Sequence, residues 1–250
     1  MRVAALYDIH GNLPALNAVL HAVREARVDR IVVGGDVFPG PLCGETLARL
    51  QELDVPVDFI RGNGEVAVIA QKRGEVPPGV PEPYRPTIEW GAHELDEDDA
   101  AFVATWPLTC SVSIPGLGDV LFCHATPRNE WDIFLPTTAE AKLLPVFEGV
   151  AQPLIVCGHS HMQFDRRVGR HRVVNAGSIG MPFGPAGADW LLLGPGVELR
   201  HTDYDLAAAA SVIRETAYPE AEAFAATYIL NPPSAEQMIA AFTPVELKQG

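Results

Sequence analysis

Five short apolar runs in this chain each end in a polar cluster, and this pattern restricts the folds that the chain can adopt. The clusters occur in the order Asp8-Ile9-His10, Gly35-Asp36, Gly62-Asn63, His124 and Gly158-His159-Ser160-His161. In open α/β sheets, ligands bind beyond the carboxyl ends of the strands. If the apolar runs are strands, the clusters come together at the same edge. The sequence therefore predicts one site built from distant segments.

The first part of the chain predicts strands that alternate with helices. Residues 3–7, 31–33 and 57–60 are short apolar runs typical of buried strands. Residues 12–27 form an amphipathic pattern with Pro14 in the first turn, and residues 43–53 form a second helical pattern. This alternation predicts parallel strands joined by right-handed crossovers.

The remainder of the chain is richer in predicted strands. Helices are expected at 87–95 and 96–106, after a proline-rich irregular loop at 73–86. A hairpin is expected from 111–114 and 120–123, with strands at 154–157, 172–174, 190–193 and 197–201. Closing helices are expected at 205–216 and 220–230, and Ser234 with Gln237 predicts a capping box. We expect an α/β (α+β) fold with one domain over residues 1–250, in which 205–250 is a C-terminal helical extension packed on it.

Charge and composition limit the partners of the protein. A net charge of −14 argues against general nucleic-acid binding, which needs clustered basic residues. A small phosphorylated substrate remains compatible with this charge, because bound cations would reverse the local field.

No apolar run is long enough for a membrane span or a signal peptide. The four cysteines form no C-x-x-C pair, and Cys123 is expected to be a buried thiol rather than a metal ligand. We therefore expect a cytoplasmic protein with no membrane contact, and a homo-oligomer remains open.

The residue types in the polar clusters suit a divalent metal, although each cluster also has a simpler interpretation. Residues i and i+2 of an extended segment point to the same side, so Asp8 can act with His10, and His159 with His161. Taken alone, D-x-H is typical of a surface loop, and the Gly-Asp and Gly-Asn pairs are typical of turns. His124 alone would be interpreted as a core histidine. The complete ordered set favours a metal site.

The ordered motifs D-x-H, GD, GN, H and GHxH resemble the calcineurin-like metallophosphoesterase superfamily. Residues 122–128 and 158–180, with Asn-Ala-Gly-Ser-Ile-Gly at 175–180, are more similar to its small bacterial and archaeal phosphodiesterase branch. The resemblance covers about residues 1–205 and implies a four-layer αββα sandwich of two mixed sheets flanked by helices. By motif, it also implies that Asp8, His10 and His161 hold one metal, that Asp36 bridges, and that Asn63, His124 and His159 hold the second.

The resemblance further implies a hydrolase with two divalent ions, drawn from Mn, Fe, Zn, Ni or Co. A metal-bridging hydroxide would attack a phosphate ester in line, with a phosphodiester favoured over a monoester. Asp36, Asn63 and His124 are then the catalytic candidates. Glu65 would orient a ligand, and Arg128 would bind a phosphate oxygen, with an ordinary surface arginine as the alternative.

The sequence departs from the family pattern at Gly64. In many relatives a histidine follows the GN motif and is thought to protonate the leaving oxygen, and glycine cannot do so. His93 could replace that acid, although an exposed helical histidine is the simpler interpretation.

Gly64 also favours a second candidate function, an interaction scaffold with a vestigial site. The retromer subunit that has this fold is an example of such a scaffold. The seven retained ligands favour an enzyme. A serine hydrolase using Ser160 or Ser178 is excluded by motif, because neither lies in G-x-S-x-G.

Overall fold

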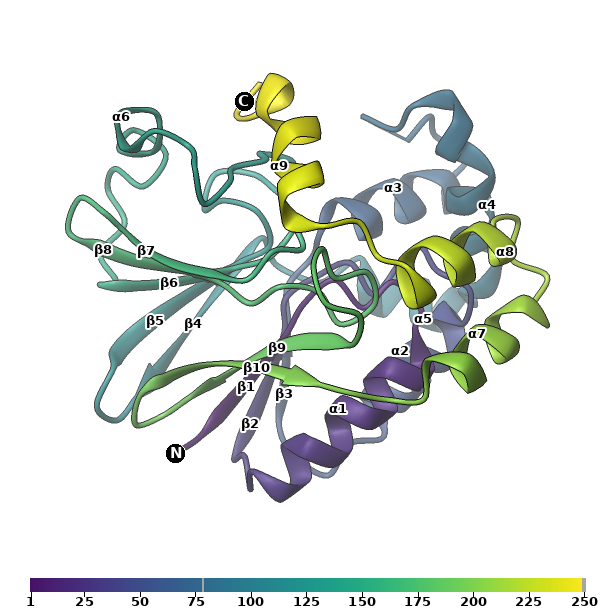
Figure 1. The fold of residues 1–250 in the computed structure, drawn as a ribbon, viewed down its shortest axis with the longest axis horizontal. Helices are drawn as coiled ribbons and strands as arrows, with labels where there is room; N and C mark the ends of the chain where they lie inside the picture. Colours follow the sequence, from purple (N-terminus) through teal and green to yellow (C-terminus); the bar gives the residue numbers. More distant parts are fainter. Residues whose placement is uncertain (78, 249–250) are drawn as a thin grey trace.

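The computed structural model describes residues 1–77 and 79–248, and two five-stranded sheets form its centre (Figure 1). The first sheet has the order β10-β9-β1-β2-β3. Its strands are β1 (Val3–Leu6), β2 (Arg30–Val33), β3 (Val57–Phe59), β9 (Ala188–Leu193) and β10 (Val197–Thr202). The first three run parallel, as the sequence predicts, and β9 and β10 complete the sheet in antiparallel register.

The second sheet has the order β4-β5-β6-β8-β7 and is also mixed. Its strands are β4 (Thr109–Ile114), β5 (Gly118–Cys123), β6 (Leu154–Cys157), β7 (Phe164–Val168) and β8 (His171–Asn175). The strands β5, β6 and β8 are parallel, with β4 and β7 antiparallel at the edges. Strand β7 was not predicted, because its three central residues are charged and only its ends are buried. Such charged positions are common on edge strands, where they oppose aggregation.

Five helices cover the outer face of the first sheet and lie together on the right of Figure 1. They are α1 (Leu13–Glu25), α2 (Cys43–Gln51), α3 (Asn63–Lys72), α4 (Arg85–Glu94) and α5 (Glu97–Val103). Asn12 caps α1 by accepting a 3.2 Å hydrogen bond from the Ala15 N–H, and the predicted apolar stripe of α1 faces the core. Helix α3 was not predicted, because its first residues resemble a turn. In the described part of the expected loop at 73–86, the structure has a 3₁₀ turn, η1 (Glu82–Tyr84), and α4 already begins at Arg85.

Three apolar clusters separate the layers. One lies between the helices and the first sheet and includes Leu6 and Leu16, and a second lies between the two sheets and includes Tyr7 and Phe122. The third covers the outer face of the second sheet. The predicted four-layer sandwich is confirmed, but the last layer is mostly irregular chain with one short helix, α6 (Glu140–Leu143).

The C-terminal part folds into further helices, of which those before residue 231 lie beside α1 and α4, whereas the last one lies apart from them (Figure 1). They are α7 (Leu206–Arg214), α8 (Ala221–Phe224), the π-helical turn η2 (Ala225–Leu230), α9 (Ala235–Phe242) and the 3₁₀ turn η3 (Thr243–Val245). The predicted capping box of Ser234 with Gln237 is confirmed. The predicted helix at 220–230 is α-helical only in its first turn. Trp90 of α4 packs against the apolar cluster of these helices.

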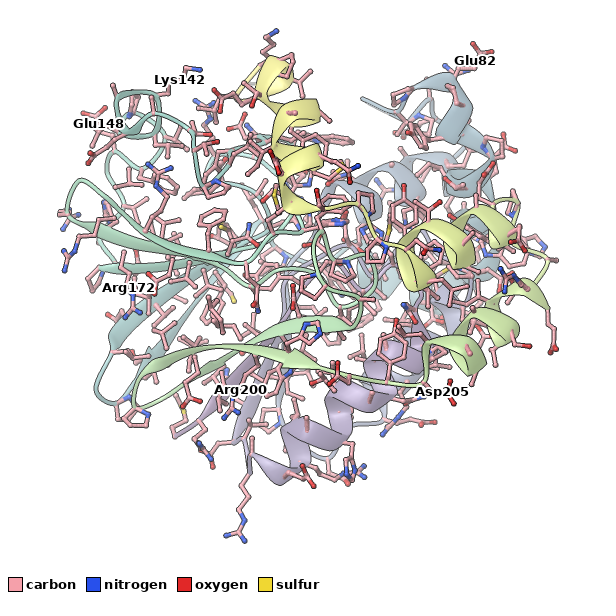
Figure 2. The ribbon with its side chains drawn as sticks, in the orientation of Figure 1. Glu82, Lys142, Glu148, Arg172, Arg200 and Asp205 are labelled. Atoms are coloured by element: carbon pink, nitrogen blue, oxygen red, sulfur yellow. The ribbon has the colours of Figure 1, made fainter. Side chains whose placement is uncertain are left out.

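Charged side chains lie at the periphery, where Glu82, Lys142 and Glu148 point outward (Figure 2). No helix within residues 1–77 and 79–248 is long and apolar enough to cross a membrane.

Candidate metal centre

Loops that follow five strands bring the seven predicted ligands together. Asp8 and His10 follow β1, Asp36 follows β2, Asn63 begins the helix after β3, His124 follows β5, and His159 and His161 follow β6. Six of them form two groups whose potential ligand atoms lie within 4.8 Å of one another: Asp8, His10 and His161 in the first group, and Asp36, His124 and His159 in the second. The structure thus assembles one compact site from the five polar clusters.

Asp36 belongs to the second group and also approaches the first. Its Oδ1 atom is 3.6 Å from Nε2 of His124, and its Oδ2 atom is 3.7 Å from Nε2 of His10. Asn63 joins the second group, because its Oδ1 atom is 3.1 Å from Nε2 of His124. One carboxylate oxygen therefore faces each group.

The backbone at the site is strained. Five of the seven predicted ligands have a positive φ, between 47° and 65°: Asp8, His10, Asp36, His159 and His161. Elsewhere in residues 1–77 and 79–248, only Arg27 and Leu247 are non-glycine residues with this conformation. Positive φ is costly for residues with a side chain and clusters at functional sites. Here it marks the loops that turn the ligands toward one another.

Backbone hydrogen bonds hold the Asp8 loop in this conformation. The segment at 175–180 packs on it, because the Gly180 N–H donates to the Asp8 carbonyl at 3.0 Å and the Ser178 hydroxyl donates to the same oxygen at 2.7 Å. The His159 N–H donates to Asp8 Oδ2 at 2.8 Å. A Cβ atom at Gly158 would lie 2.5 Å from Asp8 Oδ2, so only glycine permits this approach. The Ser178 hydroxyl therefore positions the Asp8 loop. This contact is consistent with the prediction that Ser178 is not a nucleophile.

Backbone carbonyls fix the orientation of three imidazole rings. The pairs are His10 Nδ1 with Pro39 O at 3.3 Å, His124 Nδ1 with Gly34 O at 2.9 Å, and His161 Nδ1 with Met181 O at 2.8 Å. A carbonyl oxygen only accepts hydrogen bonds, so each Nδ1 atom carries the proton. Each Nε2 atom then presents a lone pair to the site, an arrangement typical of metal-binding histidines.

The inward-facing atoms are nearly all acceptors. Nε2 of His10 and Nε2 of His161 are 3.3 Å apart, and Nε2 of His124 is 3.1 Å from Nδ1 of His159. Asp8 Oδ1 is buried without a hydrogen-bond partner among the described residues. Converging lone pairs repel one another unless a cation lies between them, and mixed imidazole and carboxylate donors suit borderline divalent ions. The side chains therefore fit the metals that the sequence predicts.

Burial sets the protonation states of the site. It lowers the pKa of His10 and the pKa of His159 to about 3, so both rings are neutral near pH 7. It raises the pKa of Asp36 to about 7. Burial also acts to raise the pKa of Asp8, but His161 and His124 outweigh it and hold that pKa below its usual range. Neutral imidazoles and ionised carboxylates are the forms that bind metals.

Glu65 lies behind the ligands and is almost completely buried. Its carboxylate accepts four backbone hydrogen bonds, from Asp36 at 2.8 Å, Val37 at 2.8 Å, Phe38 at 3.2 Å and Gly62 at 2.7 Å. One side chain therefore fixes the Asp36 loop against the Gly62 loop. The role of Glu65 in orienting a ligand stays a prediction, and these hydrogen bonds give the contacts through which it would act.

Gly64 packs against the Asp36 loop. Its N–H donates to Asp36 Oδ1 at 2.8 Å, and a Cβ atom there would lie only 1.9 Å from the Phe38 carbonyl oxygen. The loop cannot accept the histidine that many relatives carry without moving.

The other predicted positions differ in their surroundings. Arg128 lies in the loop after His124, where its Nε–H donates to Asp132, and its side chain is 40% exposed. His93 lies on the exposed face of α4, where its Nδ1 atom is 3.2 Å from Glu94 Oε1. That surrounding fits a surface histidine rather than a catalytic acid. Cys123 is a buried thiol, as expected.

A cavity of about 360 Å³ beside His10 was not predicted from the sequence. Its walls include Met181, Tyr84, Tyr218, Glu220 and Tyr228. Tyr228 belongs to η2, and Tyr218 and Glu220 lie in the connection between α7 and α8. An aromatic residue in or beside an amphipathic helical pattern is usually interpreted as core. The only signal for this cavity in the sequence was the recurrence of tyrosine near the two predicted helices at 205–216 and 220–230.

Comparisons with known proteins identify the family whose pattern this chain matches. The family model of the calcineurin-like phosphoesterase superfamily domain matches residues 1–193. An uncharacterised protein of Methanocaldococcus jannaschii is 27% identical over 172 residues, or 65% of this chain. The match spans 63% of that relative, less than two thirds of its length.

Two solved structures share the fold. A hypothetical protein of Pyrococcus horikoshii aligns with a TM-score of 0.75 and 21% identity, covering 93% of this chain and 99% of the other. A metallophosphoesterase of Sphaerobacter thermophilus aligns with a TM-score of 0.73 and 23% identity, covering 92% and 99%. Because both sequence identities are below 25%, these two structures show only that the fold is shared.

Proposed function

Since the chain belongs to the calcineurin-like phosphoesterase superfamily, a family of metal-dependent enzymes, we propose that it is a phosphodiesterase with a dinuclear metal centre. The observation that carries the proposal is the position of Asp36 between the two ligand groups, with separate oxygens 3.6 Å and 3.7 Å from His124 and His10. A carboxylate in this position is suited to bridge two ions.

The two groups define the proposed ligand sets. Asp8, His10 and His161 would hold one ion, Asn63, His124 and His159 the other, and Asp36 both. The mixed donors fit Mn, Fe, Zn, Ni or Co. When bound, such a pair supplies an activated water for in-line attack and binds the phosphoryl oxygens.

Groups of the chain hold the proposed ligands in a fixed orientation. The carbonyls of Gly34, Pro39 and Met181 keep three Nε2 lone pairs directed into the site. Glu65 fixes the loop that carries Asp36. Because these groups are held before a substrate arrives, the ligands need little rearrangement during the reaction.

The cavity beside His10 supports a diester over a monoester. A diester carries a second organic group that needs space near the reacting phosphorus, and the 360 Å³ cavity provides it. Two arginines are the proposed phosphate contacts from the chain. Arg128 remains a proposed contact through the nitrogens that do not bond Asp132. Arg61 is a further candidate, since it directly precedes the Gly62-Asn63 loop and pairs with Glu130 at 3.3 Å.

A direct test begins with chelated protein reloaded with Mn²⁺. We expect about two ions per chain by elemental analysis, and faster hydrolysis of bis(p-nitrophenyl) phosphate than of p-nitrophenyl phosphate. His21→Ala, on the exposed face of α1, is the matched control for loss of a histidine. Two bound ions without hydrolysis of any ester would instead support the scaffold that Gly64 suggests.

A further inference from the structure

Half of the residues that line the cavity beside the metal centre lie outside the part of the chain that matches the family. It extends from His10 to Tyr84 in η1 on one side, and on the other side to Tyr218 in the connection between α7 and α8 and to Tyr228 in η2. The family match ends at residue 193, so the fold provides the ligands and the C-terminal helices provide a wall. Helices α4 and α8 lie near each other on the right of Figure 1, where this wall forms.

The aromatic rings of that wall are set at steep angles. Tyr218 and Phe224 have ring centroids 6.1 Å apart at 89°, and Phe224 and Tyr228 are 5.6 Å apart at 62°. A flat base or aryl group is bound best between parallel faces. Tyr218 and Phe224 are buried in this edge-to-face packing, whereas Tyr228 is half-buried and Tyr84 is exposed, so the last two rings are the ones that a compact cationic group can contact.

The charged and polar residues that line the cavity also favour a cationic group. Glu220 at the rim is the only carboxylate among the described lining residues, and no lysine or arginine is among them. Threonine and tyrosine hydroxyls supply the remaining polarity, including Thr87 and Thr227. A second anionic group of a substrate would find no partner here, whereas a cation would meet a carboxylate and aromatic faces.

The backbone of the wall is also unusual. Thr227 and Tyr228 belong to the π-helical turn η2. Turns of this kind are rare and are frequently retained at functional sites. Tyr228 of the aromatic wall is therefore carried by the one described helical segment whose geometry departs from an ordinary α or 3₁₀ turn.

We propose that this cavity binds an ammonium group of the substrate, so that the preferred ester is a phosphodiester of a cationic amino alcohol. The proposal rests on the phosphodiesterase function proposed above. In the reaction with a nitrophenyl diester, water adds to phosphorus and the P–O bond to the nitrophenolate breaks. The phosphorylated amino alcohol is then released, and the remaining proton passes to solvent.

The test compares two diesters of the same shape with the Mn²⁺-loaded protein. One is p-nitrophenyl phosphocholine, and the other is p-nitrophenyl 3,3-dimethylbutyl phosphate, in which a neutral carbon replaces the ammonium nitrogen. We expect kcat/KM to be about tenfold higher for the cationic ester, as cation–π and carboxylate contacts at a half-open site allow. Glu220→Gln and Tyr228→Leu should each reduce that ratio to about threefold or less.

Glu222→Gln is the matched control, because it removes the same charge from α8 but faces Arg214 rather than the cavity. It should leave the ratio unchanged. Equal kcat/KM for the two esters, or a preference for the neutral one, would overturn the inference while leaving the phosphodiesterase function in place.

Binding gives a readout that does not depend on turnover. Calorimetry with phosphocholine and with 3,3-dimethylbutyl phosphate should give the same preference of about tenfold in Kd, and Glu220→Gln should reduce it. If no ester is hydrolysed, the proposed function fails, and this Kd ratio still decides the inference. A ratio of one in binding would overturn it.

Discussion

The Asp36 backbone N–H donates a 2.8 Å hydrogen bond to Glu65 Oε2, and the same oxygen accepts from the Gly62 N–H at 2.7 Å. The other oxygen accepts from Val37 and Phe38. Two loops that begin at different strands thus share one buried carboxylate. The position of Asp36 at the site depends on this shared anchor.

Glu65→Gln should therefore weaken both the fold and the metal site. An amide would turn one acceptor atom into a donor facing backbone N–H groups, which costs about 2–4 kcal/mol for the two bonds lost. Metal affinity should fall about 10–100-fold, as for other residues that orient ligands. Urea unfolding with chelator measures the first effect, and metal titration measures the second. Glu75→Gln removes the same charge from an exposed residue beyond α3 and should change neither.

Asp36→Asn should lose at least one metal and nearly all turnover while the protein stays folded. An amide has only one oxygen to offer, so it cannot reach toward His10 and His124 together. Elemental analysis and a diester assay on the same preparation give the two readouts, and circular dichroism checks the fold. Normal metal content with wild-type turnover would show that Asp36 does not bridge.

Divalent metals should raise the unfolding temperature of the chelated protein. The facing lone pairs of His10 and His161, 3.3 Å apart, repel until a cation binds them. At a metal concentration of about 100 times Kd, the stabilisation is about 2.7 kcal/mol. Thermal unfolding with chelator and with Mn²⁺ measures it. His161→Ala should reduce the shift and the exposed His21→Ala should not; equal shifts in both variants would contradict the assignment of His161.

The clustering of the proposed ligands and the alternating strands could be predicted because they depend on local pattern and on chain order. Apolar periodicity identified α1, and residue chemistry identified Asp8 and His161. Helix α3 was missed, because Gly62-Asn63-Gly64 resembles a turn. The feature that begins this helix is the capping contact of Glu65 with the Gly62 N–H, which single residues do not reveal.

Other features of the site depend on how distant loops meet. The carbonyls of Pro39 and Met181 orient His10 and His161, and a carbonyl has no signature in a sequence. The aromatic cavity was missed because its tyrosines come from segments far apart in the chain. The cytoplasmic location, the homo-oligomer and the single-domain organisation stay predictions.

Gly64 does not tolerate a side chain in this loop. A Cβ atom would lie 1.9 Å from the Phe38 carbonyl oxygen, so even Gly64→Ala must displace the loop that carries Asp36. We expect a loss of about 1–3 kcal/mol in stability, typical of overpacking, together with weaker metal binding. Gly196→Ala is the control, because a Cβ atom there meets nothing within 4 Å. Gly64→His, which would introduce a histidine after the GN motif, is consequently expected to disrupt the site.

Without an acid at position 64, the rate of hydrolysis should depend steeply on the leaving group. General acid catalysis is typically worth about 10²–10⁴-fold, and this assistance matters most for a basic alkoxide. Aryl diesters, which release stable phenolates, should therefore be cleaved far faster than alkyl diesters. The measurement is kcat/KM for a series of substituted phenyl diesters plotted against the leaving-group pKa, with single-turnover kinetics to establish that chemistry limits the rate. His93→Ala should not change the slope, because His93 is exposed and paired with Glu94. A flat plot with chemistry limiting would mean that another residue donates the proton, and a slope that steepens in His93→Ala would identify His93 as that donor.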